Sequence, residues 1–250
     1  MHALIIFAVA LAARLIHVWQ LRDTPYFDVL LGDANGYDRW AQRLAGGDWV
    51  GSDVFYQAPL YPYFLGTVYA SVGRDLLLVR LIQALIGSAS CVLLGLAAAR
   101  FFSKRVGLIA GLALALWAPA IFFDSLLQKS VLDMFFMCLS LWLIAGGSHR
   151  TAADVGNSAP EGGRRSASVA SGLSRLALGC SMAALSLSRE NGLLLVGVVA
   201  VWLWFSDKRS VLLFAAGLAL VFAPVVARNY SVDGGFYLTT SQFGSNFYIG

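Results

Sequence analysis

Apolar residues in this chain gather in long runs that are separated by shorter polar segments. A bilayer core of about 30 Å needs about 20 apolar residues in a helix. Seven runs approach or reach that length and predict transmembrane helices at residues 2–21, 76–99, 106–123, 126–147, 173–188, 191–206 and 210–227. The first run lacks a small-residue cleavage site followed by a soluble domain, so a retained span is favoured over a cleaved signal peptide. The pattern predicts an all-α, polytopic transmembrane helical bundle.

The polar segment between the first two runs, residues 22–75, has internal order of its own. From residue 33 to residue 45, apolar side chains recur at helical spacing and polar ones fill the other side, which predicts an amphipathic helix. Trp and Tyr prefer the headgroup level of a bilayer, so this helix is expected in the interface plane, with its rings in lipid and its polar face in water. A second apolar stretch, 58–73, is too short to span and is expected along the same interface.

Composition agrees with a membrane protein, because 58% of the residues are hydrophobic, 13% are charged and the mean hydropathy is +0.71. Lys and Arg are enriched in cytoplasmic loops, and they cluster here at residues 100–105, 148–175 and 206–210. These segments and the N-terminus are therefore assigned to the cytoplasm, and residues 22–75, which hold seven of the fourteen acidic residues, to the outside. The net charge of +4 follows from this topology and suggests no nucleic-acid partner.

Two further segments bear on domain organisation. Residues 148–172 are rich in Gly, Ser, Ala and Arg and predict a flexible cytoplasmic linker between two groups of helices. The chain ends at Gly250 with a loop begun and no span closing it, so we expect residues 1–250 to be one transmembrane domain of a longer, C-terminally continued protein.

No cofactor is expected from the sequence, although a dependence on metal stays open. The three His residues are scattered and the three Cys residues fall inside predicted spans without ligand spacing: His2, His17, His149, Cys91, Cys138 and Cys180. No Gly-rich nucleotide-binding loop is visible.

Several motifs carry a resemblance to a known family. An Asp at residue 33 opens a juxtamembrane helix after the first span and is followed by "GYDRWAQRLAGGDW", then by "YQAPLYPYF", and "VRLIQALIG" opens the second span. This arrangement resembles the polyprenyl-phosphate-sugar glycosyltransferases of the membrane-integral GT-C fold. The closest groups are glycosyltransferase family 39, the protein O-mannosyltransferases, and the aminoarabinose transferase that modifies lipid A. The motifs lie in 30–85, around 124–129 and at 189. Where aminoarabinose-transferase-like members carry a Lys before Pro-Pro-Leu, this chain has Gln57-Ala58-Pro59-Leu60.

The resemblance implies an inverting hexosyl or pentosyl transfer at the outer face of a membrane, here the bacterial inner (plasma) membrane. The donor would be a polyprenyl-phosphate sugar held with membrane lipid. The acceptor, which is a protein, a lipid or a cell-envelope glycan, is not identified. A carboxylate within reach of the acceptor would take its proton as general base, and the matching position is Asp33. A helix N-cap is the alternative role for an acid that opens a helix.

Four cations are candidate ligands of the lipid phosphate, because positive charge must stabilise the departing anion: Arg80, Lys129, Arg189 and Arg228. Arg189 lies on the acid-rich side, where topology needs no cation, and it is expected to converge with Arg80 on one phosphate. Lys129 has an alternative in an ion pair with Asp133, four residues on. Arg80 needs a polar partner inside the membrane, and Arg228 has an alternative as an interfacial anchor.

The remaining candidates are pocket residues of the same outer face: Tyr37, Tyr56, Gln57 and Asp124. A solvated loop acid is the alternative for Asp124. Asp38 is expected to face water or to pair with Arg39 or Gln42, without a role in catalysis.

Two other classes of function compete with the enzyme. In a transporter or flippase, Arg80, Lys129 and Asp133 would form a substrate path. These charges lie about one turn from the outer interface, and only Pro119 marks a mid-membrane break, so an interfacial site is favoured. In a structural or assembly subunit, Asp33 would act only as a cap.

Overall fold

The computed structural model describes the backbone of residues 1–153, 161–206 and 208–241, and the side chains of the same ranges except 147–171. These residues form helices and no strand, which confirms the predicted all-α class. The helices are α1 (His2–Arg22), the 3-10 helix η1 (Pro25–Phe27), α2 (Asp33–Ala45), α3 (Leu60–Val72), α4 (Leu76–Phe101), α5 (Lys104–Ala115), α6 (Ala118–Ser125), α7 (Ser130–Ala153), α8 (Glu161–Ser188), α9 (Gly192–Ser206) and α10 (Lys208–Asp233).

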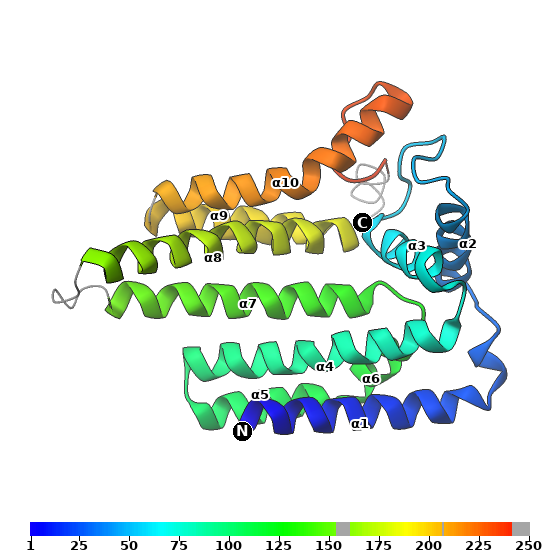
Figure 1. Cartoon of the computed structure of the whole chain (residues 1–250), viewed down its shortest axis with the longest axis horizontal. Coiled ribbons are helices and arrows are strands. Elements are labelled where there is room, and N and C mark those ends of the chain that lie inside the picture. Colours follow the sequence, from blue (N-terminus) through cyan, green and yellow to red (C-terminus); the bar gives the residue numbers. More distant parts are fainter. Residues whose placement is uncertain (154–160, 207, 242–250) are drawn as a thin grey trace.

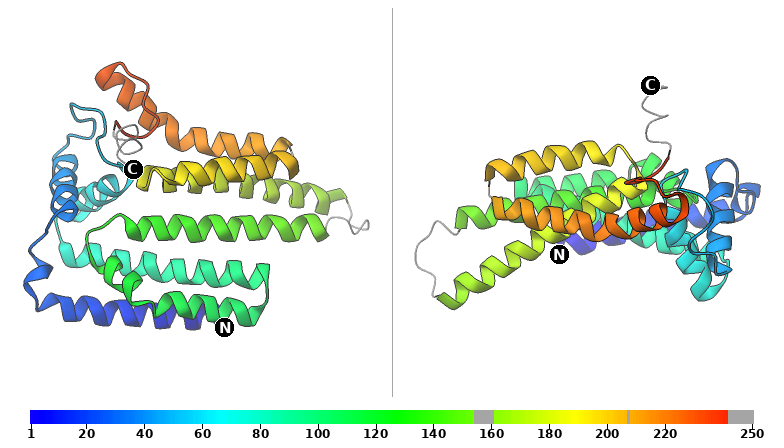
Figure 2. Two further views of the ribbon diagram at one scale, coloured as in Figure 1. Left: turned by 180° about the vertical axis from the view of Figure 1, so that it is seen from behind. Right: turned by 90° about the horizontal axis from the view of Figure 1, so that it is seen from above.

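The long helices lie side by side and form an elongated bundle (Figure 1). In this bundle α4 packs against α1, α5 and α7, and α8 packs against α7, α9 and α10. The two short helices α2 and α3 lie together beyond one end of the long helices, as the view from above in Figure 2 also shows. The start of α4, the start of α7 and the turn between α8 and α9 lie at that same end. The topology therefore gathers the polar segments of several helices at one end of the bundle.

Among the described residues, three helices are long and apolar enough to cross a membrane, namely α1, α4 and α10. The pair α5 and α6 would add a fourth if it is one bent span. Residues 130–146 of α7 and the whole of α9 are apolar but shorter. These helices are compatible with a membrane protein. The seven predicted spans are not confirmed, because three helices of the described residues qualify, or four segments with the bent pair.

The predicted single helix at 106–123 is wrong, because α5 and α6 are two helices bent by 52°. Trp117, between them, has an extended backbone with ψ 109°, and Pro119 lies in the first turn of α6. Pro cannot donate an interior helical hydrogen bond, and its ring would clash with the carbonyl four residues earlier, that of Ala115, so α5 ends there and Pro119 is accommodated in the first turn of a new helix. The bend directs the C-terminal end of α6 toward α1 and α4, which both contact it.

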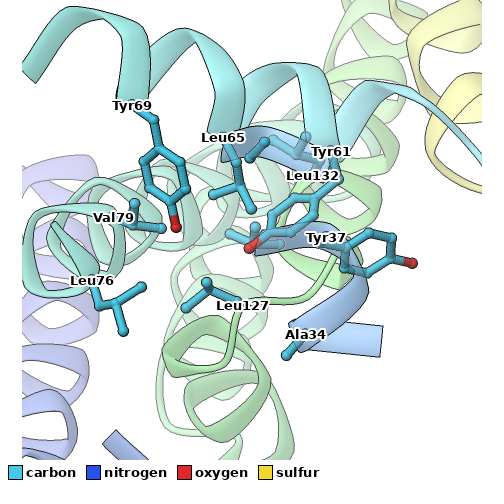
Figure 3. Close-up of a cluster of buried hydrophobic side chains, with 11 residues drawn as sticks. Ala34, Tyr37, Tyr61, Leu65, Tyr69, Leu76, Val79, Leu127 and Leu132 are labelled. Carbon is cyan, nitrogen blue, oxygen red and sulfur yellow. The ribbon is translucent and has the colours of Figure 1, made fainter. Parts of the chain in front are cut away.

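Helix α2 has the predicted bounds, but its apolar face is buried against protein, so the expectation that this face lies in lipid is wrong. That face packs against α3, in a buried cluster that also includes residues of α4 and α7 (Figure 3). The rings of Tyr37 and Tyr61 meet edge to face with centroids 5.2 Å apart. The helices approach so closely that a Cβ at Gly66 would lie 2.8 Å from the Cβ of Leu44. Amphipathic spacing is the same whether the apolar face meets lipid or protein, and here a protein surface covers it.

Asp38 is buried, so the expectation that it faces water is wrong, while its predicted pairing with Gln42 is confirmed. Its carboxylate accepts hydrogen bonds from Gln42 Nε2 at 2.8 Å, Tyr69 Oη at 2.7 Å and Arg74 Nε at 2.9 Å. The hydrogen bond to Asp38 also raises the pKa of the Arg74 guanidinium. A buried carboxylate is tolerated when charge and hydrogen bonds compensate it. This network fastens α2 to α3 and to the turn between α3 and α4.

The predicted linker at 148–172 overlaps two helices, since α7 continues to Ala153 and α8 begins at Glu161. Residues 154–160 lie outside the described part of the chain.

Candidate active site

Two cavities adjoin at the end of the bundle where α2 lies, and both are lined by Asp33, Lys129 and Arg189. The first has a volume of about 360 Å³ and the second about 300 Å³. These three residues come from α2, from the segment before α7 and from the turn between α8 and α9. Three residues predicted from the sequence as base and phosphate ligands therefore share one site.

The two cavities differ in character. Five apolar residues of the α5–α6 junction, α6 and α7 line the first, which we call the apolar cavity: Trp117, Pro119, Ala120, Phe123 and Met134. Polar side chains line most of the second, which we call the polar cavity: Tyr37, Gln57, Glu190 and Asn191. Trp117 and Phe123 are also exposed on the surface of the bundle. Asp33, Lys129 and Arg189 thus stand at the boundary between an apolar and a polar compartment.

Asp33 is the first residue of α2, and Gly32 is the N-cap. The φ of Gly32 is +57°, in the left-handed region that favours glycine. The capping alternative for Asp33 is therefore wrong, because Gly32 and not Asp33 occupies the N-cap position. Among the described residues, none forms an ion pair with this exposed carboxylate. A negative charge in the first turn is stabilised by the helix dipole. The exposed Asp33 carboxylate is therefore tolerated without an ion-pair partner.

Arg189 makes an ion pair with Asp133, with Nε 2.8 Å from Oδ2. Ser188 Oγ donates to the other oxygen of Asp133 at 2.5 Å. The predicted Lys129–Asp133 pair is therefore wrong, since Asp133 is engaged from the α8–α9 turn. Arg189 uses Nε for this contact, which leaves the two terminal nitrogens of an exposed side chain for a ligand. Lys129 takes part in no ion pair within the described residues. Two cations at the cavity boundary can therefore meet an anion.

Tyr37 and Gln57 line the polar cavity, as the sequence predicted for pocket residues. Figure 3 shows the Tyr37 hydroxyl directed away from the buried cluster. The pKa of Tyr37 is raised to about 12, first by burial and second by the nearby Asp33 carboxylate. Tyr37 is therefore a neutral hydrogen-bond donor at neutral pH.

Asp124 lines the apolar cavity, but it is buried and paired, so the solvated-loop alternative is wrong. Arg14 of α1 donates from Nε to Oδ2 of Asp124 at 2.7 Å, and Arg14 Nη1 donates to the Ala10 carbonyl at 3.2 Å. The pair is fitted against α4 at Gly87, where a Cβ would lie 2.7 Å from Arg14 Nε and would collide with the carboxylate. The sequence reading missed Arg14, although a charge in the middle of an apolar run was the available signal.

Arg80 does not line either cavity. Its guanidinium donates to the carbonyls of Ser125 at 2.9 Å and Phe27 at 2.8 Å, and lies 4.1 Å from the Phe27 ring centroid. Its neighbour Gln83 donates to the carbonyls of Asp124 and Leu126 and accepts from the Tyr61 hydroxyl. The expectation that Arg80 and Arg189 converge on one phosphate is not supported by these contacts. Arg80 finds its polar partners in the backbone where α6 ends and η1 lies.

Tyr56 and Arg228 line a third cavity of about 340 Å³, between α2 and the loop at 46–59. Arg228 lies over the Phe55 ring, 3.9 Å from its centroid, and donates from Nε to the Val50 carbonyl at 2.6 Å. The structure therefore separates these two candidates from the group around Asp33, with Gln57 lining both the third and the polar cavity.

Comparison with known proteins gives no further assignment, because no family model, curated protein or solved structure matches this chain. No group of three or more His, Cys, Asp or Glu residues that could hold a metal ion is found among the described residues.

Proposed function

We propose that the protein is an inverting glycosyltransferase that moves a sugar from a polyprenyl phosphate to an acceptor hydroxyl or amine. The observation that carries the proposal is the placement of Asp33, Lys129 and Arg189 at the boundary of an apolar and a polar cavity. A lipid-linked phosphosugar has the same order of parts, with an apolar chain, an anionic group and a polyhydroxylated ring. The resemblance of residues 30–85 to GT-C enzymes favours the same substrate class.

In the proposed step, the acceptor atom attacks the anomeric carbon from the face opposite the phosphate. The new glycosidic bond forms while the bond from the anomeric carbon to the phosphate oxygen breaks, and the bonding electrons leave with the polyprenyl phosphate. Asp33 takes the proton from the acceptor as general base. Attack opposite the leaving group by a single displacement inverts the anomeric carbon.

Arg189 and Lys129 suit the leaving group. Arg189 offers its two terminal nitrogens as a fork, and Lys129, which lines the same cavity, adds a compact positive charge. Both would stabilise the negative charge that grows on the phosphate oxygen as the bond breaks. The prenyl chain would follow the apolar cavity, beside Trp117 and Phe123, and the sugar ring would enter the polar cavity beside Tyr37.

The contacts favour this proposal over a transporter. Of the three charges of the predicted substrate path, Arg80 is held by backbone carbonyls and Asp133 by Arg189. A purely structural subunit would not require Asp33, Lys129 and Arg189 to line the same two cavities. By the distribution of Lys and Arg, the site would face the outside of the bacterial inner membrane.

The experiment that tests the proposal is transfer from a radiolabelled polyprenyl-phosphate sugar by the purified protein in liposomes. Extracted membrane material from cells that lack the protein supplies the acceptor. We expect label to move from the lipid fraction to the acceptor fraction with release of polyprenyl phosphate and inversion at the anomeric carbon. Movement of intact labelled donor across the bilayer, with no change in the glycosidic bond, would instead identify a flippase.

Replacement of Arg189 by Ala is expected to raise the donor KM by about 10- to 150-fold, because a charge-assisted contact is worth about 1.5–3 kcal/mol. Arg189→Lys should recover only part of this loss, since a point charge cannot reproduce a fork. Arg105→Ala, at the opposite end of the bundle, is the matched control and should leave the KM unchanged. An unchanged donor KM in Arg189→Ala would remove this residue from the phosphate site.

A further inference from the structure

The third cavity, between α2 and the loop at 46–59, is built from aromatic rings that support one another. The Trp40 and Phe55 centroids are 5.6 Å apart, and the Phe55 and Tyr63 centroids are 5.7 Å apart. Trp49 adds a fourth ring, 6.1 Å from Tyr63 and 39% exposed. Tyr63 Oη donates to the Trp49 carbonyl at 2.6 Å, which fixes the loop on α3. Rings held in this way form a pre-organised wall.

Four ionisable side chains complete the lining of the third cavity: Arg43, Asp48, Asp53 and Arg228. Their formal charges cancel, so the cavity has no net preference for an anion or a cation. Local contacts hold several of them in place, since Asp48 accepts from the Gly51 N–H at 2.9 Å and Asp53 accepts from Ser52 Oγ at 2.7 Å. The lining therefore offers both donors and acceptors beside flat apolar faces.

This combination selects a neutral ligand that has many hydroxyl groups and an apolar face. The C–H bonds on one face of a pyranose ring carry partial positive charge, and the face of an aromatic ring carries partial negative charge. Carboxylates and guanidinium groups bind the hydroxyls at the ring edge as acceptors and donors. A volume of about 340 Å³ is in the range of small-molecule sites.

The position of the third cavity connects it to the candidate active site. Gln57 lines both the third cavity and the polar cavity, and Gly36 of the third cavity adjoins Tyr37 of the polar cavity in α2. A chain of sugar units that begins in the third cavity would therefore point its end toward Asp33.

We propose that the third cavity binds a neutral saccharide unit of the acceptor, so that the acceptor is a glycan. The assignment of the bound saccharide to the acceptor rests on the proposed transfer function, whereas saccharide binding itself does not. Trp49 supplies the exposed ring on which the saccharide stacks.

The test is saturation-transfer NMR with the full chain in lipid nanodiscs, without donor. The probes are maltotriose, chitotriose and mannotriose as neutral trisaccharides, and trigalacturonate as an anionic one. We expect saturable binding of at least one neutral trisaccharide and weaker binding of trigalacturonate. Trp49→Ala should raise the dissociation constant about tenfold, the scale of one ring contact, and Trp49→Phe should recover most of it. Trp204→Ala, whose ring lies near Lys208 at the opposite end, is the matched control and should bind normally.

Three results would overturn the inference: absence of saturable binding by all neutral trisaccharides, tighter binding of trigalacturonate, or normal binding by Trp49→Ala. The last result would assign Trp49 to anchoring in the bilayer interface. Asp33→Asn separates this inference from the proposed function, because it should bind the trisaccharide normally. Full transfer activity in Asp33→Asn would refute the proposed base and leave saccharide binding standing.

Discussion

Asp33→Asn is expected to lower glycosyl transfer by about 10²- to 10⁴-fold, the usual scale for loss of general-base assistance. Asn has nearly the same shape but cannot take a proton at neutral pH. The helix should persist, because Gly32 and not Asp33 caps it. Donor affinity should also persist, since Lys129 and Arg189 are unchanged. Transfer rate and donor affinity measured in the same liposomes check both parts.

The matched control is Asp23→Asn, an exposed acid just after α1 that lines none of the three cavities described. It should transfer normally. Asp33→Ala should behave like Asp33→Asn, because neither variant retains a base. Near-normal turnover in Asp33→Asn would end the proposed mechanism.

Arg14→Met is expected to destabilise the folded protein by about 3–5 kcal/mol, because it leaves the Asp124 carboxylate buried without its partner. Arg14 is 2% exposed and Asp124 is 6% exposed, so solvent cannot replace the lost charge. The measurement is the free energy of unfolding by SDS titration in mixed micelles, followed by circular dichroism.

The double variant Arg14→Met/Asp124→Leu tests whether the cost comes from the stranded charge. Replacing both members of a buried pair by apolar groups is often nearly neutral, so the double variant should recover most of the loss. Arg22→Met, at the exposed end of the same helix, should change stability by less than about 0.5 kcal/mol. Equal destabilisation by the single and the double variant would show that packing, and not charge, dominates.

Local features could be predicted from the sequence because they depend on residues close in the chain. The amphipathic spacing of residues 33–45 indicated α2 with its observed bounds. The surface that covers its apolar face was not predictable from that spacing, because the same apolar face can pack against lipid or against α3. Pro119 was the visible signal for the break between α5 and α6, but the length of the apolar run suggested one helix.

The candidate site could be predicted only in part. The chemistry of Asp33, Lys129 and Arg189 pointed to one function, and the structure brings them to two shared cavities. Their partners depend on how the helices pack, since Asp133 meets Arg189 from a distant segment and Arg80 meets backbone carbonyls. Backbone acceptors have no signature in sequence. The aromatic wall of Trp40, Phe55 and Tyr63 was missed because its rings come from three separate segments.

The network around Asp38 has a consequence for how the protein responds to its membrane. Tyr69 and Arg74 tie α2 to α3 and to the turn that leads into α4, so we expect α2 to move with the bundle. A thinner or thicker bilayer changes the tilt of transmembrane helices, but such a tilt carries Asp33 and the helix bundle together. The distance of the Asp33 carboxylate from the helix bundle is thus set by the protein, through the three side chains that hydrogen-bond to Asp38, and does not change with the lipid.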